Sequence, residues 1–105
     1  MSEDIKQICF KMISNVGMAK SNFIYAIKMA KEKNYDKARE LIKEGQEFYL
    51  KGHKVHGELI TKMARGEDVE INLLLLHAED QLMMSETFRI LSEEFLDLYT
   101  KLNEK

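Results

Sequence analysis

Apolar residues recur at steps of three and four along the chain, which is the spacing of residues that share one face of an α-helix. In the first third of the chain this pattern has no polar interruption and consists of Ile5, Cys9, Met12, Val16, Ala19, Phe23, Ala26 and Ala30. It stops at Lys33 and Asn34. The pattern predicts a long first helix with one face turned into a helical bundle.

A second stripe follows, and it contains two glycines among its apolar residues: Ala38, Leu41, Gly45, Phe48, Gly52, Val55 and Leu59. We expect the two glycines to permit close packing against a neighbouring helix. The stripe ends near Arg65 and Gly66, where glycine can adopt the left-handed conformation that closes a helix. Proline is absent from the whole chain, which agrees with uninterrupted helices.

The segment GEDVEIN, residues 66–72, precedes a third helix, and its acidic residues suit a helix N-terminus. Either Asp68 or Asn72 can cap this helix, which we expect to extend to about Leu102. The same spacing selects Leu74, His77, Gln81, Met84, Phe88, Leu91, Phe95, Leu98 and Leu102. Only two members of this stripe, His77 and Gln81, are polar.

The stretch LLLLHAEDQLMM, residues 73–84, places polar residues inside an apolar run. At about 100° per residue, Asp80 shares the side of the helix that carries His77 and Gln81, whereas Glu79 points roughly the opposite way. The four leucines at 73–76 sweep about 300° around the helix axis, so this section is apolar on nearly every side. One pair of antiparallel neighbours would not cover it. We therefore expect the third helix to be central in an oligomer.

Composition excludes several classes of protein. The chain has 105 residues, 45% of them hydrophobic, so we expect a single domain over 1–105. The 16 basic and 18 acidic residues are scattered and give a net charge of -2, which indicates no nucleic-acid partner. The start, MSEDIK, does not resemble a signal peptide, and no apolar run is long enough for direct membrane insertion. A single cysteine, Cys9, suits a reducing cytoplasm.

Several residues have simpler roles than chemistry. A lone histidine on an apolar stripe is more often a core residue than a catalyst, so spacing alone leaves His77 open between the two. His53 and His56 share a helix face, but two ligands do not make a metal site, and we expect surface or packing residues. Cys9 is expected as a small buried residue. The methionines on or beside the stripes are expected to fill the core: Met12, Met29, Met83 and Met84.

Three stretches of the chain carry a resemblance to a known family. HAEDQLM at 77–83, preceded by EINLLLL and followed by TFRILSEEFLDLY, resembles the HAQDHLM region of enzyme IIA of lactose/cellobiose type from the bacterial sugar phosphotransferase system. VGMAKSNFIYAIKMAKEKNYDKARELIKEG resembles that family's first helix and turn. HGELITKMARGEDVEINLLLLHA resembles the stretch that leads into its active helix. The resemblance covers nearly the whole chain and implies an all-α, antiparallel three-helix bundle that forms a homotrimer with the third helices central.

The resemblance also implies a function as a phosphotransferase component. His77 would accept a phosphoryl group from phospho-HPr and pass it to a cysteine of the cognate enzyme IIB, which serves the membrane enzyme IIC during sugar uptake. A neutral imidazole has an unshared electron pair that can attack phosphorus, which suits this role. Asp80 would meet its two copies on the threefold axis and bind a divalent cation such as Mg²⁺. Three converging carboxylates repel one another, and a hard cation with oxygen ligands removes that repulsion.

Three residues differ from the sequence that this family usually has at these positions. Glu79 replaces a glutamine, Gln81 replaces a second histidine, and Lys20 replaces an arginine and loses its bidentate fork. Gln81 can still donate a hydrogen bond to a phosphoryl oxygen, whereas an ionised Glu79 can only repel one. These differences leave an alternative open: a trimeric, metal-holding helical interaction or regulatory module that has lost efficient phosphoryl transfer.

Overall fold

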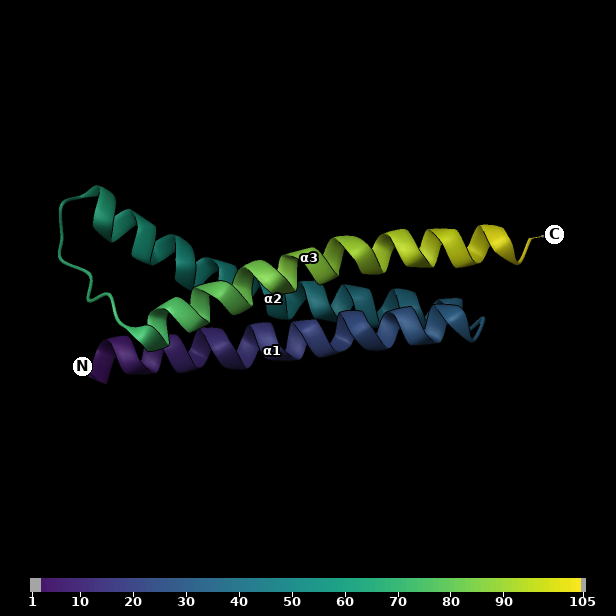
Figure 1. The fold of residues 1–105 in the computed structure, drawn as a ribbon, viewed down its shortest axis with the longest axis horizontal. Helices are drawn as coiled ribbons and strands as arrows, with labels where there is room; N and C mark the ends of the chain where they lie inside the picture. The colour runs from purple at the N-terminus through teal and green to yellow at the C-terminus, as the bar shows by residue number, and fades with distance from the viewer. Residues whose placement is uncertain (1–2, 105) are drawn as a thin grey trace.

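Three helices make up an elongated antiparallel bundle of 57 × 22 × 19 Å (Figure 1). The computed structural model describes residues 3–104 of the chain. Helix α1 is Glu3–Lys31, α2 is Tyr35–Ala64 and α3 is Leu73–Leu102. Helices α1 and α3 run in the same direction and α2 runs against both (Figure 1). The all-α, three-helix prediction is therefore confirmed, with each helix close to its predicted bounds.

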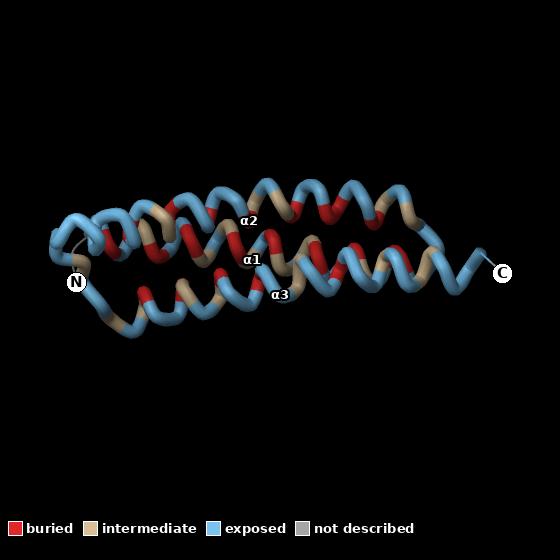
Figure 2. The backbone as a smooth tube through the Cα atoms, turned by 90° about the horizontal axis from the view of Figure 1, so that it is seen from above, coloured by how far each residue is buried: buried red, intermediate tan, exposed pale blue. Residues whose placement is uncertain are grey.

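Helix α1 contributes the centre of the core. Every member of its predicted stripe, from Ile5 to Ala30, is buried, and Figure 2 shows the buried positions of α1 turned toward the other two helices. Cys9 is fully buried, as expected. Burial raises the pKa of its thiol, and the negative charges of Glu79 and Glu70 raise this pKa further. Cys9 is therefore a packing residue with low thiolate content.

Helix α2 approaches α1 closely because of its two stripe glycines. A Cβ atom on Gly45 would lie 2.6 Å from a ring carbon of Phe23, and one on Gly52 would lie 2.6 Å from a methyl carbon of Val16. Both distances are far below van der Waals contact, so the expectation that these glycines permit close packing is confirmed. Gly66 follows the end of α2 with a φ of 79°, the left-handed conformation expected there.

Helix α3 begins at the second of the two predicted caps. The Asn72 side chain accepts a hydrogen bond from the backbone N–H of Leu75 at 2.9 Å, which satisfies one of the free N–H groups of the first turn. The helix ends at Leu102, as expected. None of the three helices, over the residues that the structure describes, is long and apolar enough to cross a membrane.

The buried line of α3 differs from the predicted stripe. It consists of Leu75, Ala78, Leu82, Ser85 and Ser92, whereas the stripe that contains His77 lies along the flank of the helix and is half-buried or exposed. The difference arises because α3 is apolar on several sides, so periodicity alone cannot select the side that packs against α1. Met83 and Met84 are exposed, so their prediction as core fillers is wrong within one chain, whereas Met12 and Met29 are buried as expected.

Candidate functional site

His77 lies in the second turn of α3 with its ring exposed to solvent. It makes no hydrogen bond or ion pair with the other described residues. An open hollow of ≈ 550 Å³ beside it is lined by Leu73, Leu74 and His77 itself. A ring nitrogen in this position is accessible to the surface of a large partner.

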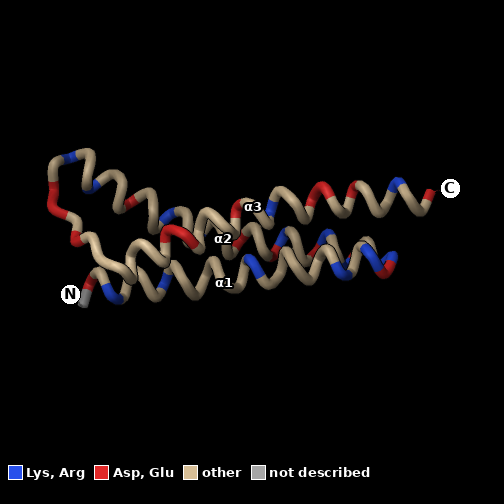
Figure 3. The backbone as a smooth tube through the Cα atoms, in the orientation of Figure 1, with Lys and Arg blue, Asp and Glu red and all other residues tan. Residues whose placement is uncertain are grey.

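His77 has the uncharged beginning of α3 on one side and the Asp80 carboxylate, three residues further along, on the other. Residues 73–78 carry no charge, so the first turns of α3 form an uncharged segment in Figure 3. Side chains of a helix lean toward its N-terminus, and this directs the His77 ring toward the first turn. The free N–H groups and the dipole of that turn favour negative charge nearby. The amino end of α3 is therefore a favourable place for an anionic group on His77.

Asp80 and Gln81 follow His77 by three and four residues, so both are its neighbours on the helix surface. Gln81 is half-buried, and Asp80 is exposed. Neither side chain has a hydrogen-bond or ion-pair partner within the described part of the chain. The amide of Gln81 and the carboxylate of Asp80 are thus both free to bind a group supplied from outside this chain.

The side of α3 that points away from the bundle is mostly apolar and exposed. We call it the outer face of α3, and it consists of Leu73, Leu76, Asp80, Met83, Met84, Thr87, Leu91, Glu94, Leu98 and Leu102. Leu73 is 82% exposed and Leu76 is 56% exposed. Contiguous apolar surface of this length is uncommon on a monomer and usually marks a protein interface. Asp80 is flanked on this face by Leu76 and Met84.

Glu79 points away from His77 and pairs with a residue of α2. Its Oε2 atom lies 2.5 Å from Nδ1 of His56. This ring nitrogen is buried and has no hydrogen-bond partner among the described residues, so its contact with Glu79 is an ion pair when the ring is protonated. Our expectation that His56 is a simple surface or packing residue was therefore incomplete. His53 is exposed, and its ring lies tilted between Tyr49 and His56 with ring centroids 5.8 and 6.1 Å away, as expected of a surface residue.

Lys20 is not part of the His77 site within one chain. Its Nζ atom lies 5.8 Å from the centroid of the Phe88 ring. Phe88 follows His77 by eleven residues, which places it about 16 Å further along α3. A metal site is also incomplete in one chain, because no group of three histidine, cysteine, aspartate or glutamate residues among residues 3–104 could hold an ion.

The comparison with known families identifies the family of the chain. The family model for the lactose/cellobiose-specific IIA subunit of the PTS system matches residues 7–100. The chain belongs to this family. The resemblance seen in the sequence is thereby confirmed, and membership assigns the chain to the phosphotransferase systems that carry out sugar uptake.

Individual members of the IIA family are similar to the chain over almost their full length. The lichenan-specific phosphotransferase enzyme IIA component of Bacillus subtilis is 35% identical over 105 residues, which are 100% of this chain and 96% of that protein. The oligo-beta-mannoside-specific EIIA component of the same organism is 36% identical over 98 residues, covering 93% and 89%. The crystal structure of the cellobiose-specific enzyme IIA from Bacillus anthracis superimposes with a TM-score of 0.95 at 40% identity, covering 100% and 96%. The three-helix fold is therefore shared with solved IIA structures.

Proposed function

We propose that His77 is the phosphoryl carrier of this IIA component, which accepts the group from phospho-HPr and passes it to the cysteine of a cognate enzyme IIB, and through it serves the membrane enzyme IIC. One observation carries this proposal: His77 has an exposed, unpaired ring beside an apolar hollow at the amino end of α3, in a chain of the IIA family. The free ring can meet a donor and an acceptor protein in turn.

The transfer needs one lone pair and correct alignment. The unprotonated nitrogen of His77 attacks phosphorus in line, a P–N bond forms, and the bond to the donor breaks with its electron pair left on the donor. In the second step the thiolate of enzyme IIB attacks the same phosphorus, and the His77 ring leaves with the electron pair of the P–N bond. Gln81 supports both steps, because its amide can donate a hydrogen bond to a phosphoryl oxygen from one helical turn away.

Glu79 does not oppose this chemistry. Two residues separate positions on an α-helix by about 200°, so Glu79 lies on the far side of α3 from His77. Its carboxylate is held by His56 of α2 at 2.5 Å. The negative charge gained at this position is thus directed away from the phosphoryl group.

The outer face of α3 supports assembly into a homotrimer with the third helices central. This face is apolar and exposed in one chain, and packing against two further copies would bury it. Three Asp80 carboxylates would then converge, and their oxygens suit a hard divalent cation such as Mg²⁺, which neutralises their repulsion. The unpaired carboxylate of Asp80 fits this purpose. Asp80 has a structural role in this arrangement and takes no part in the transfer.

The proposal is tested by incubating the chain with phosphoenolpyruvate, enzyme I and HPr, followed by an intact-mass measurement. Wild type should gain one phosphoryl group in a linkage that is stable in alkali and lost in acid, since a protonated phosphoramidate has a good leaving group. His77→Ala should gain none. His53→Ala is the matched control and should gain one group, because its ring lies on α2 and packs against Tyr49. Full phosphorylation of His77→Ala would show that the carrier residue is a different one.

A further inference from the structure

The contact between α2 and α3 includes a line of polar residues, which we call the α2–α3 seam. On α2 it comprises Gln46, Tyr49, His53 and His56, which recur at steps of three and four. On α3 it comprises Glu79, Glu86, Arg89 and Glu93. The other helix contacts differ, since α1 presents an apolar stripe to both neighbours. A few specific polar contacts of the seam therefore add to the apolar packing between α2 and α3.

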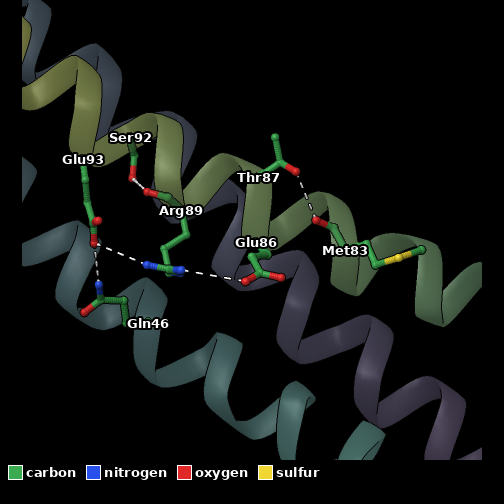
Figure 4. A network of polar contacts seen from close by, with 7 residues as sticks. All are labelled: Gln46, Met83, Glu86, Thr87, Arg89, Ser92 and Glu93. Atoms are coloured by element: carbon green, nitrogen blue, oxygen red, sulfur yellow. Dashed lines mark hydrogen bonds and ion pairs between the residues drawn. The ribbon is translucent and has the colours of Figure 1, made fainter.

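One group of these contacts lies far from His77, and we call it the distal bridge. Gln46 donates a hydrogen bond to Glu93 at 2.7 Å, and Arg89 lies 3.8 Å from Glu93 and 3.9 Å from Glu86 (Figure 4). The guanidinium also lies over the Tyr49 ring, 6.0 Å from its centroid. Burial raises the pKa of Tyr49, and the nearby Glu86 carboxylate raises this pKa further, so the phenol stays protonated.

The second group is the His56–Glu79 pair, in which Glu79 lies two residues from His77 on α3. When His56 is protonated, it is the one ion pair between two helices within residues 3–104. Its side chains are only 30% and 24% exposed, so water competes weakly for the contact. Glu79 is two residues from His77 on the same helical turn. The pair therefore connects α2 to the part of α3 that carries the reactive ring.

The His56–Glu79 pair lies near the point along the bundle where α2 and α3 begin to separate. All three helices meet at Gly52, where Val16 and Leu82 both lie close to the glycine. Beyond this point α2 and α3 diverge toward the connecting loop (Figure 1). A hollow of ≈ 450 Å³ lies at that end of the bundle between α1, α2 and the connecting loop, and its apolar lining is Ile5, Ile8, Leu59 and Val69. The His56–Glu79 pair is thus the last side-chain bridge between α2 and α3 before the helices separate.

We propose that His56, acting through Glu79, is a positioning residue for phosphoryl transfer at His77. The first turns of α3 pack on α1 through Leu75 and Ala78, and the pair adds a second attachment on the α2 side. Two attachments fix the rotation and tilt of these turns, whereas one leaves them free to rock. In-line transfer between two proteins depends on such alignment. This inference rests on the proposed function of His77.

The test combines a double-mutant cycle with a control on the same seam. The variants are His56→Gln, Glu79→Gln and the double variant, and the control is Gln46→Ala, which breaks the distal bridge. Rapid-quench measurements with purified phospho-HPr give the transfer rate at saturation and the half-saturating concentration. Circular dichroism gives the melting temperature of each protein.

Each single variant should lower the saturating rate about fivefold while the half-saturating concentration stays unchanged, because alignment is lost but docking is not. The double variant should recover most of the rate, since two facing amides can hydrogen-bond with each other. Gln46→Ala should lower the melting temperature and leave the rate at its wild-type value. This dissociation of stability from rate distinguishes positioning from a merely structural role.

Three results would overturn the positioning role. If the single variants accept the phosphoryl group at the wild-type rate or faster, the pair does not align His77. A double variant slowed by the product of the two single effects would show that the residues act independently. An equal loss of rate in Gln46→Ala would show that any weakening of the seam has the same effect. If wild type itself gains no phosphoryl group, the proposed function fails, and that result is distinct because it precedes every comparison between variants.

Discussion

Gln81 is the residue nearest to His77 that can contact a phosphoryl oxygen from the same face of α3. It is half-buried, one helical turn from His77, and its amide has no partner among the described residues. An amide donates a hydrogen bond but carries no charge, whereas a protonated imidazole adds a positive charge to the contact. The side chain at 81 is therefore expected to affect the transfer rate without deciding whether transfer occurs.

We expect Gln81→His to speed phosphoryl transfer from phospho-HPr by about tenfold, because charge-assisted hydrogen bonds are roughly twice as strong as neutral ones. Rapid-quench kinetics of the phosphorylated fraction measure this change. Gln81→Ala is the matched comparison and should be slower than wild type. If wild type stays unphosphorylated with several HPr proteins while Gln81→His accepts the group, the chain is a metal-holding or regulatory module that has lost transfer.

The sequence predicted the local part of the site and missed the part made between helices. His77, Asp80 and Gln81 lie within five residues, so helical geometry alone places them together. Glu79 and His56 are 23 residues apart, on two helices. Their contact depends on the register of α2 against α3, which no local pattern encodes. A polar stripe on α2 that includes His53 and His56 was the available signal for such a seam.

At the scale of the helix, the interior of the bundle depends on the small residues of α2 and α3. Gly45 and Gly52 permit the close approach of α2, and the buried line of α3 includes Ala78, Ser85 and Ser92. Small residues let helix backbones lie near each other, and the packed interior leaves little space for added atoms. Replacing them should therefore affect stability according to the space around each one.

Gly52→Ala should lower the free energy of unfolding by about 1–2 kcal/mol, because the added methyl group would overlap the buried Val16 side chain. Gly57→Ala on the same helix is the control. No atom lies within 4 Å of the Cβ position there, so alanine should raise the free energy of unfolding by about 0.5–1 kcal/mol. Urea unfolding followed by circular dichroism measures both changes. Equal effects at the two glycines would contradict the role of close packing at Gly52.

Helix lengths and caps were predictable, but the orientation of α3 was not. The stripes of α1 and α2 each have one apolar side, so their periodicity selected the buried side correctly. In α3 the run at 73–76 and the outer face add apolar residues on further sides, and several phases of the pattern fit equally well. The side of α3 that packs against α1 is the one with the smaller residues, since Ala78 and Ser85 allow the two helices to approach each other.

At the scale of the whole molecule, the apolar outer face of α3 is left uncovered in a single chain. Asp80 is the one acidic residue between Leu73 and Met84 on that face, and it is exposed. Burial of an unpaired carboxylate is costly, so an assembly that covers this face must neutralise Asp80 or remove it.

We expect the wild-type chain to sediment as a trimer at micromolar concentration in the presence of Mg²⁺ and to dissociate more readily after chelation with EDTA. Asp80→Leu should remain trimeric with and without the chelator, because it exchanges three converging carboxylates for apolar packing. Sedimentation equilibrium measures both proteins. Monomers in the wild type would contradict the trimer, and monomers in Asp80→Leu alone would show that the cation is indispensable for assembly.

The separation of the two faces of α3 has a consequence for related proteins in the same cell. The buried line of Leu75, Ala78 and Leu82 maintains the fold, while the outer face takes no part in the chain's own core. Substitutions on the outer face can therefore change which chains assemble together at little cost to the folding of each. Paralogous chains that share this bundle could form separate homomeric assemblies through differences on this face alone, which would insulate one sugar-uptake route from another.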